Sequence, residues 1–114
     1  MIEGFTKTVI RCNGVDLAVH RAGQGTPLLL IHGFPQNHMC WESVAPQLAR
    51  HHDVIIPDLR GYGESDAPAN DSGNTTYSKR TMAQDIADLL TALGMSRADV
   101  LAMTAARGLP IVLR

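Results

Sequence analysis

The sequence predicts an α/β fold in which buried parallel strands alternate with helices. Two short apolar runs, Leu28–Ile31 and Val54–Pro57, have the length and composition of fully buried strands. A segment whose apolar residues recur at helical spacing follows each of them, and a third strand is predicted at Asp99–Met103. This alternation is typical of a parallel sheet wound with helices. We find neither internal repeats nor a linker, so the 114 residues are expected to form one domain.

A β-hairpin is expected ahead of these strands. The segments Thr6–Cys12 and Val15–Arg21 are rich in strand-forming residues, and they flank the pair Asn13-Gly14. An Asn-Gly pair favours the tight turn whose twist matches that of two paired strands. Residues 22–27 contain two glycines and a proline, and they predict a loop before the first buried strand.

Two helices are predicted between the buried strands. The first covers residues 39–50, where four apolar residues fall at helical spacing: Trp41, Val44, Leu48 and Ala49. The second follows Ser78, which is a good N-cap, and ends at Gly94, where a C-terminal glycine cap belongs. Its apolar stripe consists of Met82, Ile86, Leu89, Leu90 and Leu93. Residues 59–76 are rich in Gly, Pro, Asp, Ser and Asn, which predicts a loop.

Composition and charge argue against several kinds of partner. The formal net charge is −1 and there is no basic amphipathic stretch, so neither nucleic acid nor a membrane surface is expected as a partner. No apolar run approaches the roughly 20 residues that span a bilayer, and the N-terminus does not have the pattern of a signal peptide. Cys12 and Cys40 match no zinc or redox spacing, which favours free thiols. We therefore expect a cytoplasmic protein without a cofactor.

The histidines predict no metal site. His51 and His52 follow the first predicted helix and are expected to lie in solvent, and two adjacent histidines without a third ligand bind metal poorly. His20 and His38 have no recognisable partners in the sequence.

The first buried strand ends in an unusual turn, His32-Gly33-Phe34-Pro35. Glycine permits backbone angles that other residues avoid, and proline cannot continue a strand ladder. A turn of this kind points backbone N–H groups beyond the edge of the sheet, as in an oxyanion hole. For His32, a packed and hydrogen-bonded residue at the strand end is the favoured interpretation, and a proton shuttle is the alternative.

A second motif, Asp58–Asp66 (Asp-Leu-Arg-Gly-Tyr-Gly-Glu-Ser-Asp), lies one strand–helix–strand unit later. Asp58, Arg60, Gly61 and Gly63 are expected to fix a turn through glycine geometry and an internal ion pair. Direct participation of these residues in catalysis is the less favoured alternative.

Together with Trp41 and Tyr77-Ser78, these motifs resemble the α/β-hydrolase fold family, in particular the branch of haloacetate (fluoroacetate) dehalogenases and epoxide hydrolases. The resemblance covers about residues 3–101 and is most specific over residues 28–66. It implies that the backbone N–H of Phe34 is one oxyanion-hole donor. It also implies a small-molecule substrate and a hydrolysis in two steps. An Asp carboxylate displaces halide from carbon, or opens an epoxide, to form an ester, and a His-activated water then hydrolyses the ester.

The family pattern stops after Leu101. Haloacetate dehalogenases continue with Gly-His-Asp-Arg-Gly, in which the Asp is the nucleophile, whereas this chain continues Ala-Met-Thr-Ala-Ala-Arg-Gly. The resemblance therefore divides the chain into an N-terminal portion of the hydrolase core, residues 1–101, and a tail outside the family pattern, residues 102–114. It implies that nucleophile, catalytic acid, catalytic base and lid are all missing, so the chain is expected to be inactive alone.

The tail has a specific explanation in the genetic code. A typical family continuation is Gly-His-Asp-Arg-Gly-Ala-Arg-Val-Ala-His-Arg-Leu-Ala. With permitted codons and the first base deleted, it translates into residues 102–114 as they stand. We expect a frameshift at about Leu101–Ala102.

Three alternatives stay open: an epoxide hydrolase, another α/β-hydrolase fragment such as an esterase-like relative, and a non-enzymatic interaction fragment completed by a second chain. The predicted strand Asp99–Met103 would be unpaired on one side, and such an exposed sheet edge predicts self-association and poor solubility.

Overall fold

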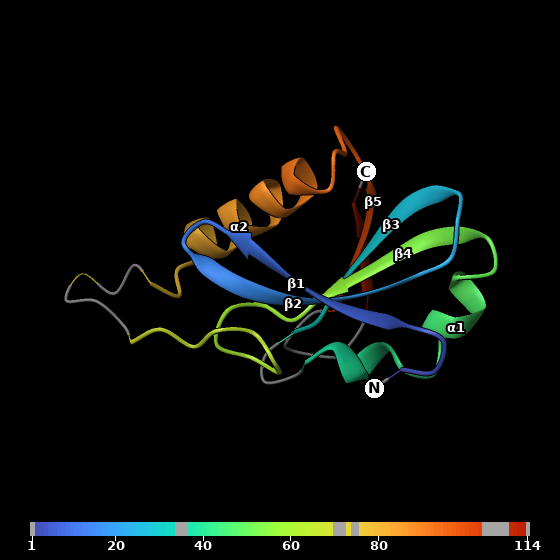
Figure 1. The fold of residues 1–114 in the computed structure, drawn as a ribbon, viewed down its shortest axis with the longest axis horizontal. Coiled ribbons are helices and arrows are strands. Elements are labelled where there is room, and N and C mark those ends of the chain that lie inside the picture. Colours follow the sequence, from blue (N-terminus) through green and yellow to red (C-terminus); the bar gives the residue numbers. More distant parts are fainter. Residues whose placement is uncertain (1, 34–36, 70–72, 74–75, 104–109, 114) are drawn as a thin grey trace.

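A computed structural model of the chain describes residues 2–33, 37–69, 73, 76–103 and 110–113. A six-stranded sheet in the order β1-β2-β4-β3-β5-β6 runs through it, with helical segments on both faces (Figure 1). The strands are β1 (Thr6–Cys12), β2 (Val15–Ala22), β3 (Thr26–Ile31), β4 (His52–Pro57), β5 (Asp99–Met103) and β6 (Pro110–Leu113). None of the described helices is both long and apolar enough to cross a membrane.

The predicted hairpin and parallel strands are confirmed. β1 and β2 pair antiparallel around a turn in which Asn13 and Gly14 both have positive φ, 49° and 82°. This is the requirement of the tight turn that an Asn-Gly pair favours. β3 lies between β4 and β5 and is parallel to both, so the carboxyl ends of all three strands open at one edge of the sheet.

The prediction of one helix over residues 39–50 is wrong. The structure has a 3-10 helix, η1 (His38–Trp41), and a short α-helix, α1 (Ala45–Leu48). Pro46 explains the break, because proline has no backbone N–H and is tolerated only in the first turn of a helix, where it lies in α1. Trp41 is buried as expected, whereas Val44 is 41% exposed.

The second helix, α2 (Lys79–Ala92), has the expected ends. The Ser78 hydroxyl accepts a hydrogen bond from the Thr81 backbone N–H at 3.1 Å. Leu93 is the C-cap, and Gly94 follows with φ +74°, the left-handed conformation of a glycine cap. The C-terminal signal in the sequence was therefore accurate to the residue.

Alternating side chains of the central strands bury both faces of the sheet. Val54 and Ile56 pack toward η1 and α1, in a cluster with Ile2, Phe5, Leu30, Trp41 and Ala45. Ile55 points to the opposite face and packs toward α2, in a cluster with Cys12, Val15, Leu17, Val19, Leu29 and Leu89. Burial on both faces explains why these strands read as continuous apolar runs.

The expectation that Asp99–Met103 is unpaired on one side is wrong. β6 pairs antiparallel with β5, with Val100 opposite Leu113 and Met103 opposite Pro110. The open edge of β5 offers a row of backbone N–H and C=O groups that an extended segment can pair with. In this chain β6, which belongs to the tail, is that segment. The described sheet therefore ends at β1 and β6, and self-association stays a prediction.

Candidate functional site

The two sequence motifs meet at the carboxyl edge of the parallel strands. His32 directly follows β3 and Asp58 directly follows β4, and these two strands are neighbours. In open α/β sheets, ligands bind beyond the carboxyl ends of the strands. Phe34 and Pro35, the expected oxyanion-hole donor and its neighbour, lie outside the described residues.

His32 joins the two motifs. Its side chain is buried, and its Nε2 accepts a hydrogen bond from the Leu59 backbone N–H at 3.0 Å. Because Nε2 accepts, the ring proton belongs on Nδ1, which lies 3.0 Å from the Gly33 carbonyl oxygen and donates to it. Burial lowers the pKa of His32, which favours this neutral form. Both ring nitrogens are thus engaged in holding the turn.

Asp58 is fully buried and accepts several hydrogen bonds. Its Oδ1 accepts from the His38 backbone N–H at 2.7 Å, and its Oδ2 accepts from the Glu64 backbone N–H at 3.1 Å. Burial alone raises the pKa of Asp58, but the contacts with His20, Glu64 and His38 outweigh it and hold the pKa well below its usual range. The carboxylate is therefore ionised, and it fixes the loop that follows β4.

The expectation that His20 and His38 lack partners is wrong. His38 Nδ1 lies 2.9 Å from Asp58 Oδ1, and His20 Nε2 lies 3.4 Å from Asp58 Oδ2. The two imidazole rings stack with centroids 3.6 Å apart. Sequence spacing could not pair residues on different elements. In the alternation of β2, His20 falls on the face opposite to Val15, Leu17 and Val19, so the pattern gave no signal that its ring is buried beside a carboxylate.

The glycines of the second motif permit a close approach to Asp58. Gly63 has φ +52°, and a Cβ placed on it would lie 2.4 Å from the Asp58 Cγ. Gly61 has φ +84°, and a Cβ there would lie 2.6 Å from a ring carbon of Tyr77. Any other residue at position 63 would combine backbone strain with a collision against the buried carboxylate.

Arg60 links the motif to α2. Its guanidinium donates to both Asp85 oxygens at 2.6 Å, and also to the Thr76 and Asn13 carbonyl oxygens at 3.1 and 3.2 Å. The expectation of an ion pair internal to the motif is therefore wrong: Arg60 pairs with Asp85 of α2, and the Asp85 carboxylate raises the pKa of Arg60. Sequence reasoning missed Asp85. The available signal was its position four residues before Leu89, on the buried side of the helix.

Two further contacts fasten the motif to β2. Ser65 Oγ accepts from the Ala18 backbone N–H at 2.8 Å, and Asp66 Oδ2 accepts from the Asp16 backbone N–H at 2.9 Å. The Asp66 backbone N–H donates in turn to the Asp16 carbonyl oxygen. The loop is therefore held on two sides, by α2 and by β2.

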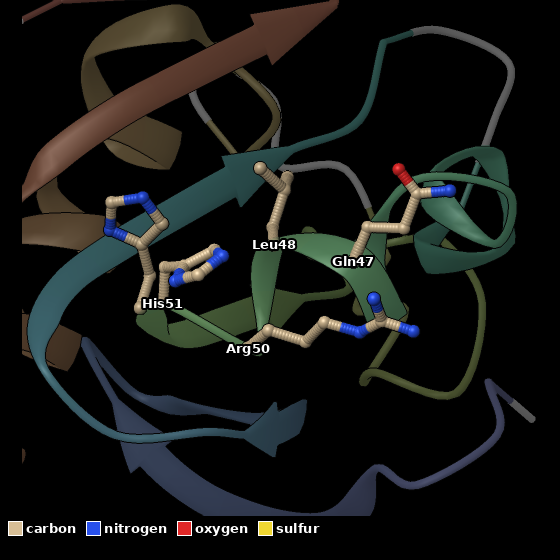
Figure 2. A pocket seen from close by; sticks show the side chains of 5 residues that line it. Gln47, Leu48, Arg50 and His51 are labelled. Carbon is tan, nitrogen blue, oxygen red and sulfur yellow. The ribbon is translucent and has the colours of Figure 1, made fainter.

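A cavity in the described structure borders this site. It has a volume of about 380 Å³ and is lined by Gly61, Tyr62, Tyr77 and Met82. A second cavity of about 380 Å³ is lined by Gln47, Leu48, Arg50, His51 and His52 (Figure 2). Because His52 begins β4, this second cavity lies at the amino end of the strand, away from the two motifs. The expectation that both His51 and His52 lie in solvent holds for exposed His51, whereas His52 is half-buried in β4.

The sheet order, the turn after β3 and the loop after β4 define a hydrolase-type α/β core. Residues 26–103, more than half of the chain, match the family model described as alpha/beta hydrolase fold. The chain belongs to this family.

Among curated proteins, the chain is similar to a fluoroacetate dehalogenase from Burkholderia sp, with 42% identity over 85% of this chain and 32% of that protein. It is also 43% identical to a soluble epoxide hydrolase from Corynebacterium sp. (strain C12), over 78% of this chain and 29% of that protein. A crystal structure from Salmonella enterica, of a protein provisionally assigned as an acyltransferase, superposes with a TM-score of 0.83 and 55% identity. That match covers 87% of this chain and 33% of the other. The chain thus spans about a third of the length of the relatives it matches.

Proposed function

We propose that this chain supplies one half of the oxyanion hole of a hydrolase of the haloacetate dehalogenase type, and that the chain as given does not turn over such substrates alone. The observation that carries the proposal is the register of β3 with β5, in which Ile31 lies opposite Ala102. The carboxyl ends of β3 and β5, from which the turn at His32 and the residues after β5 continue in the sequence, are therefore neighbours in the sheet.

The two-step hydrolysis requires a nucleophile and oxyanion-hole donors close to each other, beyond the carboxyl ends of these two strands. A carboxylate must attack the carbon that bears the halogen, form an ester and release halide. Water must then attack the ester carbonyl, whose oxygen becomes negatively charged and needs backbone N–H donors. The Phe34 N–H is the donor that this chain would contribute, and His32 holds the start of its turn through Gly33.

The nucleophile is the part that the sequence does not supply here. Residues 102–108 read Ala-Met-Thr-Ala-Ala-Arg-Gly and contain no carboxylate. Asp58 is no substitute, because its oxygens already accept backbone hydrogen bonds. We infer that residues 102–114 are an out-of-frame reading of a family continuation that includes Gly-His-Asp-Arg-Gly.

Epoxide opening is the second candidate reaction. The near-equal identities to the dehalogenase and the epoxide hydrolase favour neither substrate. The same Asp ester chemistry serves both, so the oxyanion-hole proposal does not depend on the choice.

The gene and one added base test the proposal. We expect the DNA beyond codon 101 to encode Gly-His-Asp-Arg-Gly in another frame, and the protein made after restoring the frame to release fluoride from fluoroacetate or to open an epoxide. The chain as given should do neither. Absence of that motif from every frame, or turnover by the purified chain, would overturn the proposal.

The donor role of Phe34 is tested in the restored protein. Phe34→Pro removes the backbone N–H, whereas Phe34→Ala changes the side chain and keeps the N–H. Loss of one oxyanion-hole donor costs about 100- to 1000-fold in kcat. We expect this loss for Phe34→Pro relative to Phe34→Ala. Equal kcat values for the two variants would refute the donor role.

A further inference from the structure

The proposed hydrolysis assigns no role to the cavity beside the second motif. This cavity has a volume of about 380 Å³ and is lined by Gly61, Tyr62, Tyr77 and Met82. Small-molecule pockets usually have volumes of about 300–1000 Å³, and in open α/β sheets they lie beyond the carboxyl ends of the strands. Gly61 and Tyr62 belong to the loop that follows β4 at this edge of the sheet. The cavity therefore has the size and the place of a ligand site.

Both tyrosine rings of the cavity are held in place by the protein itself. The Tyr77 hydroxyl donates to the Pro68 carbonyl oxygen, and the Tyr77 ring lies so close to Gly61 that a Cβ there would come within 2.6 Å of a ring carbon. The Tyr62 ring contacts the His32 ring edge to face, with the two centroids 5.3 Å apart. Tyr62 thus connects the cavity to the turn that begins at His32. Because both rings are already positioned, a ligand does not have to order them when it binds.

The chemistry of the lining favours a ligand without charge. Among the described lining residues, none carries a charge. Arg60, which precedes Gly61, directs its guanidinium to the Asp85 carboxylate, so its charge is already compensated. Met82 lies near the start of α2 (Lys79–Ala92) and contributes a flexible thioether, which packs favourably against aromatic rings.

We propose that the cavity lined by Gly61, Tyr62, Tyr77 and Met82 binds the ring of a small, uncharged aromatic ligand. Aromatic rings attract one another edge to face or offset-stacked at centroid distances of about 4.5–7 Å, and a thioether sulfur contacts a ring favourably at about 5 Å. A flat ring in this cavity gains both kinds of contact, whereas a saturated ring of the same size gains only from its burial. A carboxylate would lose its water without meeting a cation, which is costly.

The test is a ¹⁹F NMR titration of 4-fluorobenzyl alcohol with the purified chain, which requires no turnover. We expect saturable binding with a Kd of about 1 mM, which is ordinary for a ligand of this size. Competition then separates ring chemistry from burial. Cyclohexylmethanol should compete roughly 2- to 12-fold more weakly than benzyl alcohol, the fold-change that corresponds to one aromatic pair. Benzoate, which carries a charge, should compete more weakly than benzyl alcohol as well.

Two substitutions locate the binding site. Tyr62→Leu replaces one aromatic ring by an aliphatic side chain and should weaken binding of 4-fluorobenzyl alcohol roughly 2- to 12-fold. Met82→Ala removes the thioether and should also weaken binding. Its matched control is Met95→Ala, the same substitution beyond the other end of α2, where Met95 packs against the cluster around Leu89. This control should leave the affinity unchanged, and circular dichroism reports whether each variant folds.

Any of three results would overturn the proposal. The first is no saturable binding by the parent chain. The second is a cyclohexylmethanol affinity equal to or higher than that of benzyl alcohol, which burial alone would produce. The third is unchanged affinity in both Tyr62→Leu and Met82→Ala, or an equal loss in Met95→Ala and Met82→Ala. The first two results come from the parent chain, so the test does not depend on whether a variant folds, and its outcome is independent of the proposed hydrolysis.

Discussion

The buried ion pair between Arg60 and Asp85 should be among the largest single contributions to holding the loop that follows β4. Arg60 is 5% exposed and Asp85 is 0% exposed, and two hydrogen bonds of 2.6 Å join them. In Asp85→Asn, one amide oxygen can still accept, but the amide NH₂ faces guanidinium N–H groups. The variant therefore leaves a buried cation without its counter-charge.

The expected cost is about 3–5 kcal/mol, the range measured when one partner of a buried ion pair is removed. A domain of this size has a total free energy of unfolding of roughly 6–17 kcal/mol, so the loss is a large fraction of it. With a urea m-value of about 2 kcal/mol per molar, the unfolding midpoint should fall by roughly 2 M. Arg60→Met/Asp85→Leu should lose less than Asp85→Asn alone, because it removes both charges together.

Trp41 is the single tryptophan and is 3% exposed, so its fluorescence reports unfolding in urea. The matched control is Arg11→Met, which breaks an ion pair with Asp16 whose side chains are 66% and 45% exposed. Exposed pairs of this kind contribute about 0–1 kcal/mol. A loss below about 1 kcal/mol for Asp85→Asn, or a larger loss in the double variant than in the single one, would refute the reasoning.

Three further substitutions probe other parts of the structure by the same unfolding measurement. Gly63→Ala should destabilise by more than Gly14→Ala, because both have positive φ but only Gly63 would place a Cβ against Asp58; equal losses would contradict the collision. Burial, followed by the charges of Asp85, Asp88 and Asp16, raises the pKa of Cys12 from 9.0 to about 11. The stability that the protonated Cys12 thiol contributes is present below pH 9.0 and is lost as the pH rises toward 11. Cys12→Ala should therefore reduce the loss of folding free energy between these two pH values, and an unchanged loss would count against this reasoning. Ser78→Ala removes the N-cap of α2 and should cost about 1 kcal/mol, whereas Ser96→Ala at an exposed turn should cost little; similar losses in both would exclude a capping role.

Local signals predicted the fold where one segment alone decides its structure. The Asn13-Gly14 turn, the apolar strands and the ends of α2 each depend on residues close together in the sequence. The prediction of one helix over residues 39–50 was wrong because it relied on apolar spacing and did not consider that Pro46 breaks the interior of a helix. The pairing of β5 was missed because β6 joins it through backbone groups, which carry little sequence signature.

The candidate site was predictable only in part, because its contacts join residues that lie far apart in the sequence. The glycines of the second motif predicted a tight turn, but they did not indicate that Gly63 lies against Asp58. The partners of that motif, Asp85 and His38, come from α2 and η1, and no sequence spacing connects them. Reasoning from the sequence considered the adjacent pair His51 and His52, whereas the histidines that contact Asp58 come from β2 and η1.

The contacts also form a continuous path from α2 to the turn after β3. Asp85 holds Arg60, the neighbouring Leu59 N–H donates to His32, and His32 donates to the Gly33 carbonyl. If this path sets the turn, loss of the Asp85 charge should loosen the Leu59 contact and leave His32 Nε2 without its donor.

The ring nitrogens of His32 report this directly in ¹⁵N NMR spectra. In the parent chain, we expect an unprotonated Nε2 and a protonated Nδ1 at neutral pH, because burial lowers the pKa of His32. Under conditions in which Asp85→Asn still folds, the two nitrogen signals should move toward tautomer averaging, while Arg11→Met leaves them in place. Unchanged signals in Asp85→Asn would show that β3 and β4 hold the turn without help from α2, and that the Arg60 ion pair stabilises the fold but does not position the site.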